Sequence, residues 1–284
     1  MSGQPQTSHD QNPAATLVLP PRLTDSARSL RDTAQARGMR TVHLPTFEVP
    51  ADLQAQHLHA GPSFADAVAD RLGIALLEAP ADWLATLPKE FTRREIQAMP
   101  LAEAYALRRP VFVKSPNDKG ITARVYADGS RLPGPDAVDP TTLVLVSDVT
   151  TFTSEFRLYL LDGRVHTGAR YAAHGKLSLG PLSPAATAFA VDLLAGCART
   201  LPSAIVVDIG TVADDGWAVI EANAAWASGR YTADPDAALD VVLRTAAPID
   251  RLSSRDQPFV RRRTALAQAT QEVACATPAC SRRG

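Results

Sequence analysis

One segment constrains the fold of this chain more than any other: residues 203–226, SAIVVDIGTVADDGWAVIEANAAW. Two runs of apolar and β-branched residues flank a short polar stretch, and this pattern predicts a β-hairpin. A four-residue loop pairs Asp208 with Glu221, whereas a tighter two-residue turn pairs Asp208 with Asn223. Because the two registers differ by two residues, both place the three polar side chains on one face. The opposite face is predicted to consist of Ile205, Val207, Ile209, Ala218, Ile220 and Ala222.

Two carboxylates and an amide oxygen on neighbouring strands form a site of hard oxygen ligands. Mg²⁺ commonly takes one or two carboxylates and completes its shell with water and nucleotide phosphates. Asp208, Glu221 and Asn223 are therefore candidate metal ligands. The alternative is a half-exposed sheet edge on which the two acids occur by chance.

A second hairpin is predicted over residues 155–171, EFRLYLLDGRVHTGARY, with its turn at Asp162-Gly163. One predicted face carries Glu155, Arg157, Tyr159, His166 and Arg170. The other carries Phe156, Leu158, Leu160, Val165 and Ala169. Arginines beside a carboxylate can hold phosphate or a developing oxyanion. They can equally form surface ion pairs of little energetic consequence, and His166 is interpreted as a pairing residue.

A lysine stands near the end of another predicted strand. In VFVKSPNDKG (residues 111–120), alternation turns the two valines inward and leaves Lys114 on the opposite side with Phe112. Lys119 lies in the turn that follows. A lysine on the inner side of a nucleotide cleft supplies a compact charge for phosphates. A strand-end lysine in solvent is the alternative.

The remaining pattern predicts an α/β unit followed by antiparallel strands. Residues 1–14 are polar and lack periodicity, which predicts a disordered leader. Residues 15–108 are predicted to hold a small parallel sheet, with strands at 15–20, 41–45 and 74–79 and helices at 25–38 and 63–73. Residues 109–252 are predicted to hold strands at 110–118, 121–129 and 143–149, both hairpins, and helices at 183–199 and 234–245. By composition, 175–178 is a candidate lid.

Charge and cysteine content exclude several classes of protein. Lys plus Arg is 29 and Asp plus Glu is 30, a net charge of -1 that argues against a protein built mainly to bind nucleic acid. No apolar run approaches the ~20 residues of a membrane helix, and no signal-peptide pattern is seen at the N-terminus. Three cysteines give no disulfide framework, so we expect a cytoplasmic protein.

The C-terminal segment, residues 253–284, is basic. From Arg255 onward it carries six arginines against Asp256 and Glu272, which predicts a solvated or partly disordered appendix. A docking element for a partner or RNA is the alternative. Cys275 and Cys280 lack the neighbouring ligands that a zinc site needs.

Taken in order, these pieces resemble the ATP-grasp superfamily. The resemblance covers roughly residues 74–250 and lies closest to a compact branch of that superfamily. Its motifs are the strand lysine, the strand LVLVSDV, the acid-x-Arg motif at 155–157, the lone Asp208 and the E-x-N motif at 221–223. Further matching stretches are DWLATLP, FTRREI and the WASGRY that follows E-x-N. The N-terminal unit would then correspond to the pre-ATP-grasp domain.

The resemblance implies a fold and a reaction. The fold is an α/β N-terminal unit followed by an α+β ATP-grasp fold, in which two antiparallel sheets enclose ATP and Mg²⁺ bridges its phosphates. The reaction is that of a carboxylate–amine ligase: a small carboxylate substrate attacks the γ-phosphate, and an amine acceptor displaces phosphate from the acylphosphate. An amino acid or peptide-like substrate is expected, and a homodimer is common in the family. The alternatives are an ATP-dependent phosphotransferase and a nucleotide-binding regulatory or RNA-interacting protein.

Individual roles follow from the same resemblance. The nucleotide contacts implied are Lys114, Glu155 of the acid-x-Arg motif, the hinge residues Ser147, Asp148 and Val149, and Arg93 or Arg94 in place of an earlier lysine. Arg157 would steady the transferred phosphate, and Asp208, Glu221 and Asn223 would bind the metal. Arg230, with Trp226 and Tyr231, lies where family members contact substrate. The chain lacks the usual glycine-rich phosphate loop, and Lys119 is the expected substitute.

Overall fold

The computed structural model describes residues 15–117, 120–213 and 216–262. Its N-terminal unit contains a parallel sheet in the order β2-β1-β3. The strands are β1 (Thr16–Leu19), β2 (Arg40–His43) and β3 (His57–Leu58), and the helices are α1 (Asp25–Ala36) and α2 (Pro62–Val68). Thr24 caps α1, because its hydroxyl oxygen accepts from the Ala27 N–H at 3.2 Å.

The strand predicted over 74–79 does not join this parallel sheet. It forms β4 (Ile74–Leu76), which pairs antiparallel with β14 (Ala246–Pro248). The third position of the parallel sheet is taken by β3, which pairs with β1. A strand of two residues carries no alternation from which periodicity could predict it.

The second sheet is antiparallel, with four strands in the order β5-β8-β6-β7. The strands are β5 (Ile96–Pro100), β6 (Val111–Lys114), β7 (Arg124–Tyr126) and β8 (Leu143–Ser147), accompanied by α5 (Leu101–Ala104) and the 3-10 turn η1 (Gly129–Arg131). The two valines of β6 lie in the core of this unit, as alternation predicted. Because β5 precedes residue 108, the boundary predicted there cuts through the sheet.

The third sheet is antiparallel, with five strands in the order β11-β10-β9-β12-β13. The strands are β9 (Phe152–Leu161), β10 (Arg164–Ala173), β11 (Lys176–Pro181), β12 (Ala204–Val212) and β13 (Trp217–Asn223). Residues 176–178 of the candidate lid therefore begin an edge strand. The sheet contains both predicted hairpins.

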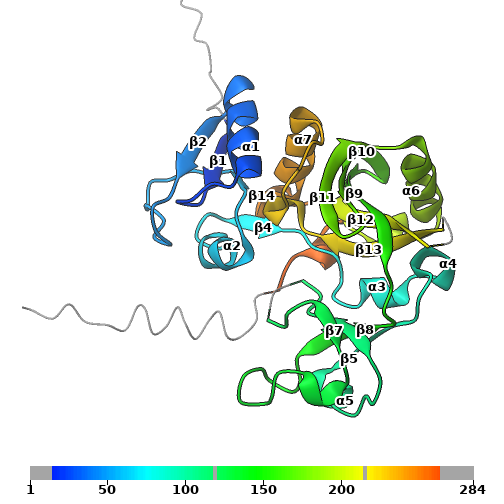
Figure 1. The fold of residues 1–284 in the computed structure, drawn as a ribbon. Helices are drawn as coiled ribbons and strands as arrows, with labels where there is room; N and C mark the ends of the chain where they lie inside the picture. Colours follow the sequence, from blue (N-terminus) through cyan, green and yellow to red (C-terminus); the bar gives the residue numbers. More distant parts are fainter. Residues whose placement is uncertain (1–14, 118–119, 214–215, 263–284) are drawn as a thin grey trace, which may run out of the picture.

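Helices cover both faces of the five-stranded sheet (Figure 1). α6 (Pro184–Cys197) and α3 (Trp83–Thr86) pack on one face, and α4 (Lys89–Thr92) lies along β13. α7 (Pro235–Thr245) packs on the other face together with α1 and β1, so the N-terminal unit and the sheet share a core. Short 3-10 turns complete the fold: η2 (Ala198–Thr200), η3 (Ala225–Ala227), η4 (Ile249–Arg251) and η5 (Gln257–Phe259).

β-bulges change the faces that simple alternation predicted. In the β12–β13 hairpin, Asp208 is opposite Glu221, the register of the four-residue loop, but Ile209 is opposite Val219. Ile220 is therefore an extra residue, and Trp217 and Val219 pack into the core where Ala218 and Ile220 were expected.

A register shift in the β9–β10 hairpin likewise moves Arg170. It pairs with Phe156, whereas Ala169 pairs with Arg157. Ala169 packs on the same side as Tyr159, so the prediction that Arg170 shares the face of Arg157 is wrong. The Arg170 Nε–H donates instead to the Ser178 carbonyl at 3.2 Å.

The C-terminal segment is part of the fold as far as residue 262. Val260 bridges to Leu77, and Arg261 forms ion pairs with Asp66 and Glu78. Asp256 is buried and accepts from the Ser203 N–H at 2.6 Å. The predicted solvated appendix is therefore wrong for residues 253–262. The predicted leader and the tail beyond 262 lie outside the described residues.

The architecture confirms the predicted fold class of an α/β N-terminal unit followed by an α+β fold with two antiparallel sheets. In Figure 1 the four-stranded sheet lies below the five-stranded sheet. Among the described residues, no helix combines the length and apolar character that a membrane span requires.

Candidate functional site

A cleft of about 530 Å³ lies where the three parts of the fold meet. The loop that follows β6 forms one wall, the end of β13 and the turn η3 form another, and residues of the N-terminal unit close the third side. Lys114, Glu221, Asn223 and Trp226 line the cleft. The sequence-predicted residues thus reach one cavity from two different sheets.

The three predicted metal ligands converge, as the hairpin pattern indicated. The Asn223 Nδ2–H₂ group donates to Asp208 Oδ2 at 3.2 Å and to Glu221 Oε1 at 2.9 Å. Asp208 is buried, and its two oxygens accept from Arg157 Nε at 2.8 Å and Nη2 at 2.7 Å. Glu221 forms an ion pair with Lys114, which reaches it from the other sheet.

Burial and pairing set the electrostatics of this cluster. Complete burial raises the pKa of Asp208, although the Arg157 guanidinium opposes the shift. Burial would also raise the pKa of Glu221, but the Lys114 ammonium outweighs it and lowers that pKa. Burial disfavours the charge of Arg157, yet its pKa is raised because Asp208 lies against it. Glu221 is therefore an ionised, acceptor-rich group at the edge of the cleft.

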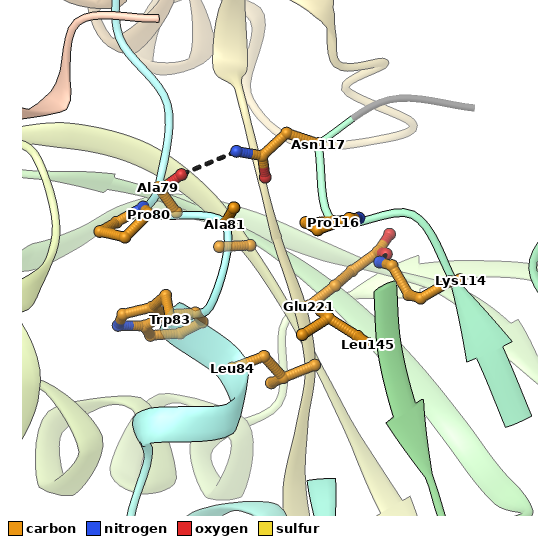
Figure 2. Close-up of a pocket in the computed structure, with 11 residues that line it drawn as sticks. Ala79, Pro80, Ala81, Trp83, Leu84, Lys114, Pro116, Asn117, Leu145 and Glu221 are labelled. Atoms are coloured by element: carbon orange, nitrogen blue, oxygen red, sulfur yellow. Dashed lines mark hydrogen bonds and ion pairs between the residues drawn. The ribbon is translucent and has the colours of Figure 1, made fainter. Parts of the chain in front are cut away.

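A narrow apolar pocket lies directly behind the Lys114–Glu221 pair. Figure 2 shows Trp83, Leu84 and Leu145 lining it below the two charged head groups. Leu145 is the β8 residue opposite Lys114 in the sheet, whereas Ser147 is opposite Phe112. Of β8, the structure thus brings Leu145 rather than Ser147 next to the strand lysine.

Asp148 and Val149, the other predicted hinge residues, follow the end of β8. Asp148 accepts from Arg109 Nη1 at 3.0 Å and from the Glu95 N–H at 3.3 Å. Val149 is half exposed. These contacts join Asp148 to the segment before β5, and the structure shows no contact of either residue with the Asp208–Glu221 cluster among the described residues.

The two candidate arginines before β5 point to different places. Arg93 has a left-handed backbone (φ 50°) and its Nε–H donates to the Trp217 carbonyl at 3.2 Å, near the hairpin turn. Arg94 reaches the centre of β13, where it donates to the Val219 and Ile220 carbonyls. Arg94, not Arg93, therefore lies next to the part of β13 that leads into Glu221.

Glu155 meets Arg157 through aromatic rings rather than directly. It accepts from the Tyr171 hydroxyl at 2.7 Å, and Tyr171 stacks on Tyr231 with ring centroids 4.9 Å apart. The guanidinium of Arg157 lies 5.2 Å from the centroid of the Tyr231 ring. Tyr171 was not predicted, because a register shift of β10 brings it to this position.

Arg230 is engaged elsewhere. Its Nε–H donates to the Ser29 hydroxyl of α1 at 2.9 Å, and its Nη1 donates to the Ala233 carbonyl at 2.6 Å. The residue thus ties the segment after E-x-N to the N-terminal unit. Lys119, the predicted substitute for a phosphate loop, lies outside the described residues.

Asn117 is a further contact across the cleft that the sequence did not reveal. Its Nδ2–H₂ group donates to the Ala79 carbonyl at 2.8 Å, which joins the loop after β6 to the segment between β4 and α3 (Figure 2). The only available signal was its place in the loop that follows the strand lysine.

The donor set fits a magnesium ion that is shared with a nucleotide. Asp208 and Glu221 supply two carboxylates, and a half-turn of the Asn223 amide would present its oxygen. Among the described residues, no group of three or more His, Cys, Asp or Glu side chains could hold a metal. A cation here would therefore need ligands from outside the chain, as Mg²⁺ obtains from water and phosphates.

Comparisons with known proteins bear on the family of the chain. A family model for an ATP-grasp domain, described as family 2 of its clade, matches residues 91–241, just over half of the chain. A search of curated proteins gave no match.

Solved structures were matched as well. The D-cycloserine synthetase DcsG is 14% identical with a TM-score of 0.53, covering 81% of this chain and 99% of that one. The ATP-grasp ligase PsnB in complex with a minimal precursor is 15% identical (TM-score 0.49; 82% and 99% covered). D-Alanine–D-alanine ligase from Bacillus anthracis is 13% identical (TM-score 0.46; 82% and 97% covered). With the family match, the resemblance first suggested by the motifs is confirmed: the chain belongs to the ATP-grasp superfamily.

Proposed function

We propose that this protein is an ATP-dependent carboxylate–amine ligase that forms an amide bond and releases ADP and phosphate. The observation that carries the proposal is the convergence of Lys114, Arg157 and the Asp208–Asn223–Glu221 cluster at one cleft between two sheets. Cations for phosphate and oxygen ligands for a metal are the two requirements of phosphoryl transfer.

In this proposal the bonds change in two steps. A substrate carboxylate oxygen attacks the γ-phosphorus, the bond to the ADP oxygen breaks, and an acylphosphate forms. An amine nitrogen then attacks the acyl carbon, the carbon–oxygen bond to phosphate breaks, and the amine loses a proton. Bound Mg²⁺ would supply Lewis-acid neutralisation of the phosphate charge, held by Asp208, Glu221 and Asn223.

The protein's own side chains contribute charge and position. Lys114, a compact cation at the edge of the cleft, exchanges Glu221 for a phosphate oxygen when nucleotide binds. Arg157 stays fixed, because Asp208 holds two of its nitrogens and the Gly229 carbonyl accepts from the third at 3.1 Å. Such a preorganised guanidinium stabilises charge on the transferred phosphoryl group without reorganising.

The reaction needs no nucleophilic side chain. Cys197 is the described cysteine, and it is buried in α6 on the opposite face of the sheet, where burial raises the pKa of its thiol. An inert, protonated thiol in that place is consistent with catalysis by positioning and electrostatics.

Size and family set the proposed substrates. A cleft of about 530 Å³ suits part of a nucleotide and a small partner. We therefore propose an amino acid or peptide-like carboxylate and an amine acceptor, with the reaction in the cytoplasm, where ATP is available. A homodimer is likewise part of the proposal.

The test is an ADP-release assay on the full chain with Mg²⁺, ATP and pools of amino acids, followed by mass analysis of the product. A ligase gives ADP and an amide only when acid and amine are both present. ADP with a phosphorylated product in the absence of an amine would indicate a phosphotransferase instead.

Matched variants locate the chemistry. Glu221→Gln keeps the shape of the side chain but removes its charge, and it is expected to lower turnover by at least about 100-fold. Glu103→Gln, on exposed α5, is the control and should leave turnover unchanged. Full turnover in both Glu221→Gln and Asp208→Asn would remove the proposed metal site.

A further inference from the structure

Strand β13 contains one extra residue at the point where it passes the candidate site. Asp208 is opposite Glu221 and Ile209 is opposite Val219, so Ile220 has no partner in the β12 register. Ile220 leans to the side of Gly210, where its Cδ1 lies 3.2 Å from the position a Cβ would occupy. Such bulges re-aim the side chains that follow them.

The extra residue decides where Glu221 points. In a regular strand, Trp217, Val219 and Glu221 would share one face, because alternation has a period of two. Trp217 and Val219 pack against the core under α6, so regular alternation would aim the Glu221 carboxylate into that core. With Ile220 inserted, Glu221 and Asn223 lie instead beside Asp208.

A single buried arginine holds the carbonyls of this bulge. Arg94 donates from Nη1 to the Val219 carbonyl at 2.9 Å and from Nη2 to the Ile220 carbonyl at 3.3 Å. Its Nη1 also donates to the Thr92 carbonyl at 2.9 Å, which ties the bulge to the end of α4. The left-handed conformation of Arg93 ends that helix and turns the next side chain toward β13.

Arg94 is an unusual cation, because nothing in the described part of the chain pairs it with a carboxylate. Burial is the sole cause of the shift that lowers its pKa to about 10. The Phe152 ring, 5.5 Å from the guanidinium carbon, adds a cation–π contact. A charge kept in a partly buried place with only carbonyls and a ring as partners costs stability, and such a cost is tolerated where the residue has a positional role.

We propose that Arg94 is a positioning residue that fixes the bulge at Ile220 and so keeps Glu221 and Asn223 on the face that carries Asp208. The proposal rests on the proposed function only in that the aligned groups serve a metal–nucleotide complex. It replaces the phosphate contact implied by family resemblance, because both terminal nitrogens of Arg94 donate to backbone carbonyls.

The variants are Arg94→Met, which keeps the bulk, and Arg94→Lys, which keeps the charge but not the two-pronged donor. Arg93→Met is the matched control, since the neighbouring arginine contacts the same strand outside the bulge. The first measurement is hydrogen–deuterium exchange of peptides spanning 217–223. The amides at 219–221 are expected to exchange at least about 10-fold faster in Arg94→Met and as in the wild type in Arg93→Met.

The second measurement is ADP affinity with and without Mg²⁺. Loss of a residue that orients metal ligands typically weakens metal affinity about 10–100-fold. Arg94→Met should lose that factor from the Mg²⁺-dependent part of ADP binding and keep its metal-free affinity within about twofold. Arg94→Lys should lie between the two, and it carries the test if Arg94→Met does not fold.

The outcomes separate this proposal from the proposed function. A wild-type chain without Mg²⁺-dependent ADP binding would refute the proposed function, while the exchange measurement would still decide the role of Arg94. Wild-type exchange at 219–221 in both variants would overturn the positioning role. So would lowered thermal stability with unchanged Mg²⁺ dependence, which is the result of a merely structural contact.

Discussion

Replacing Asp208 with asparagine is expected to destabilise the fold strongly. The Asp208 and Arg157 side chains are only 2% and 13% exposed and form two hydrogen bonds of 2.7 and 2.8 Å, so solvent screens the pair little. Asp208→Asn leaves the guanidinium buried without a counter-charge. Breaking a buried pair in this way typically costs about 3–5 kcal/mol. For a domain of this size the loss corresponds to a fall in Tm of roughly 6–20 °C.

The assay is urea denaturation followed by circular dichroism, with Asp162→Asn as the matched control. Asp162 pairs with Arg244 at 3.2 Å, and the two side chains are 56% and 46% exposed. An exposed pair contributes about 0–1 kcal/mol, so the control should change little. The double variant Asp208→Leu/Arg157→Met should be less destabilised than Asp208→Asn, because it leaves no unpaired charge. A loss below about 1 kcal/mol in Asp208→Asn would refute this reasoning.

Three further predictions concern pH, the cleft and the strand lysine. His59 is buried with its Nδ1 unpartnered, and burial lowers its pKa from 6.5 to about 4. The unfolded chain then binds a proton that the folded chain does not, so the contribution of this group to stability is complete above the unfolded pKa of 6.5. Stability should fall by about 2–3 kcal/mol between roughly pH 7 and 4.5 in urea titrations, and His59→Leu should lack this fall. Asn117→Ala removes the bond to the Ala79 carbonyl and should weaken ADP binding about 3–10-fold in calorimetry, whereas unchanged affinity would mean that the contact does not hold the cleft. Lys114→Met removes the partner of Glu221 and a phosphate contact, so ADP affinity should fall about 10-fold or more; an unaltered affinity would exclude Lys114 from the nucleotide site.

The sequence predicted the parts of the site that depend on local pattern. Asp208 and Glu221 face each other because a four-residue loop sets the register, and the apolar residues of β12 fix which side is buried. Helix starts at Thr24, Ser183 and Asp234 were equally visible, because each of these side chains accepts from a backbone N–H of the first turn.

What the sequence missed depends on contacts that no local pattern encodes. The bulge at Ile220 inverts the alternation of the first half of β13, so Val219 rather than Ala218 joins the core. β5 carries a single β-branched residue and is a strand only because it pairs with β8. The basic composition of the C-terminal segment concealed that Arg261 has buried acidic partners.

The most direct test of the proposed site is a crystal structure of the full chain with Mg²⁺ and ADP. We predict that Lys114 leaves Glu221 for a phosphate oxygen and that the metal lies among Asp208, Glu221 and Asn223, with Arg157 still paired to Asp208. A bound nucleotide that leaves the Lys114–Glu221 pair intact, or that lies outside the cleft, would contradict the account.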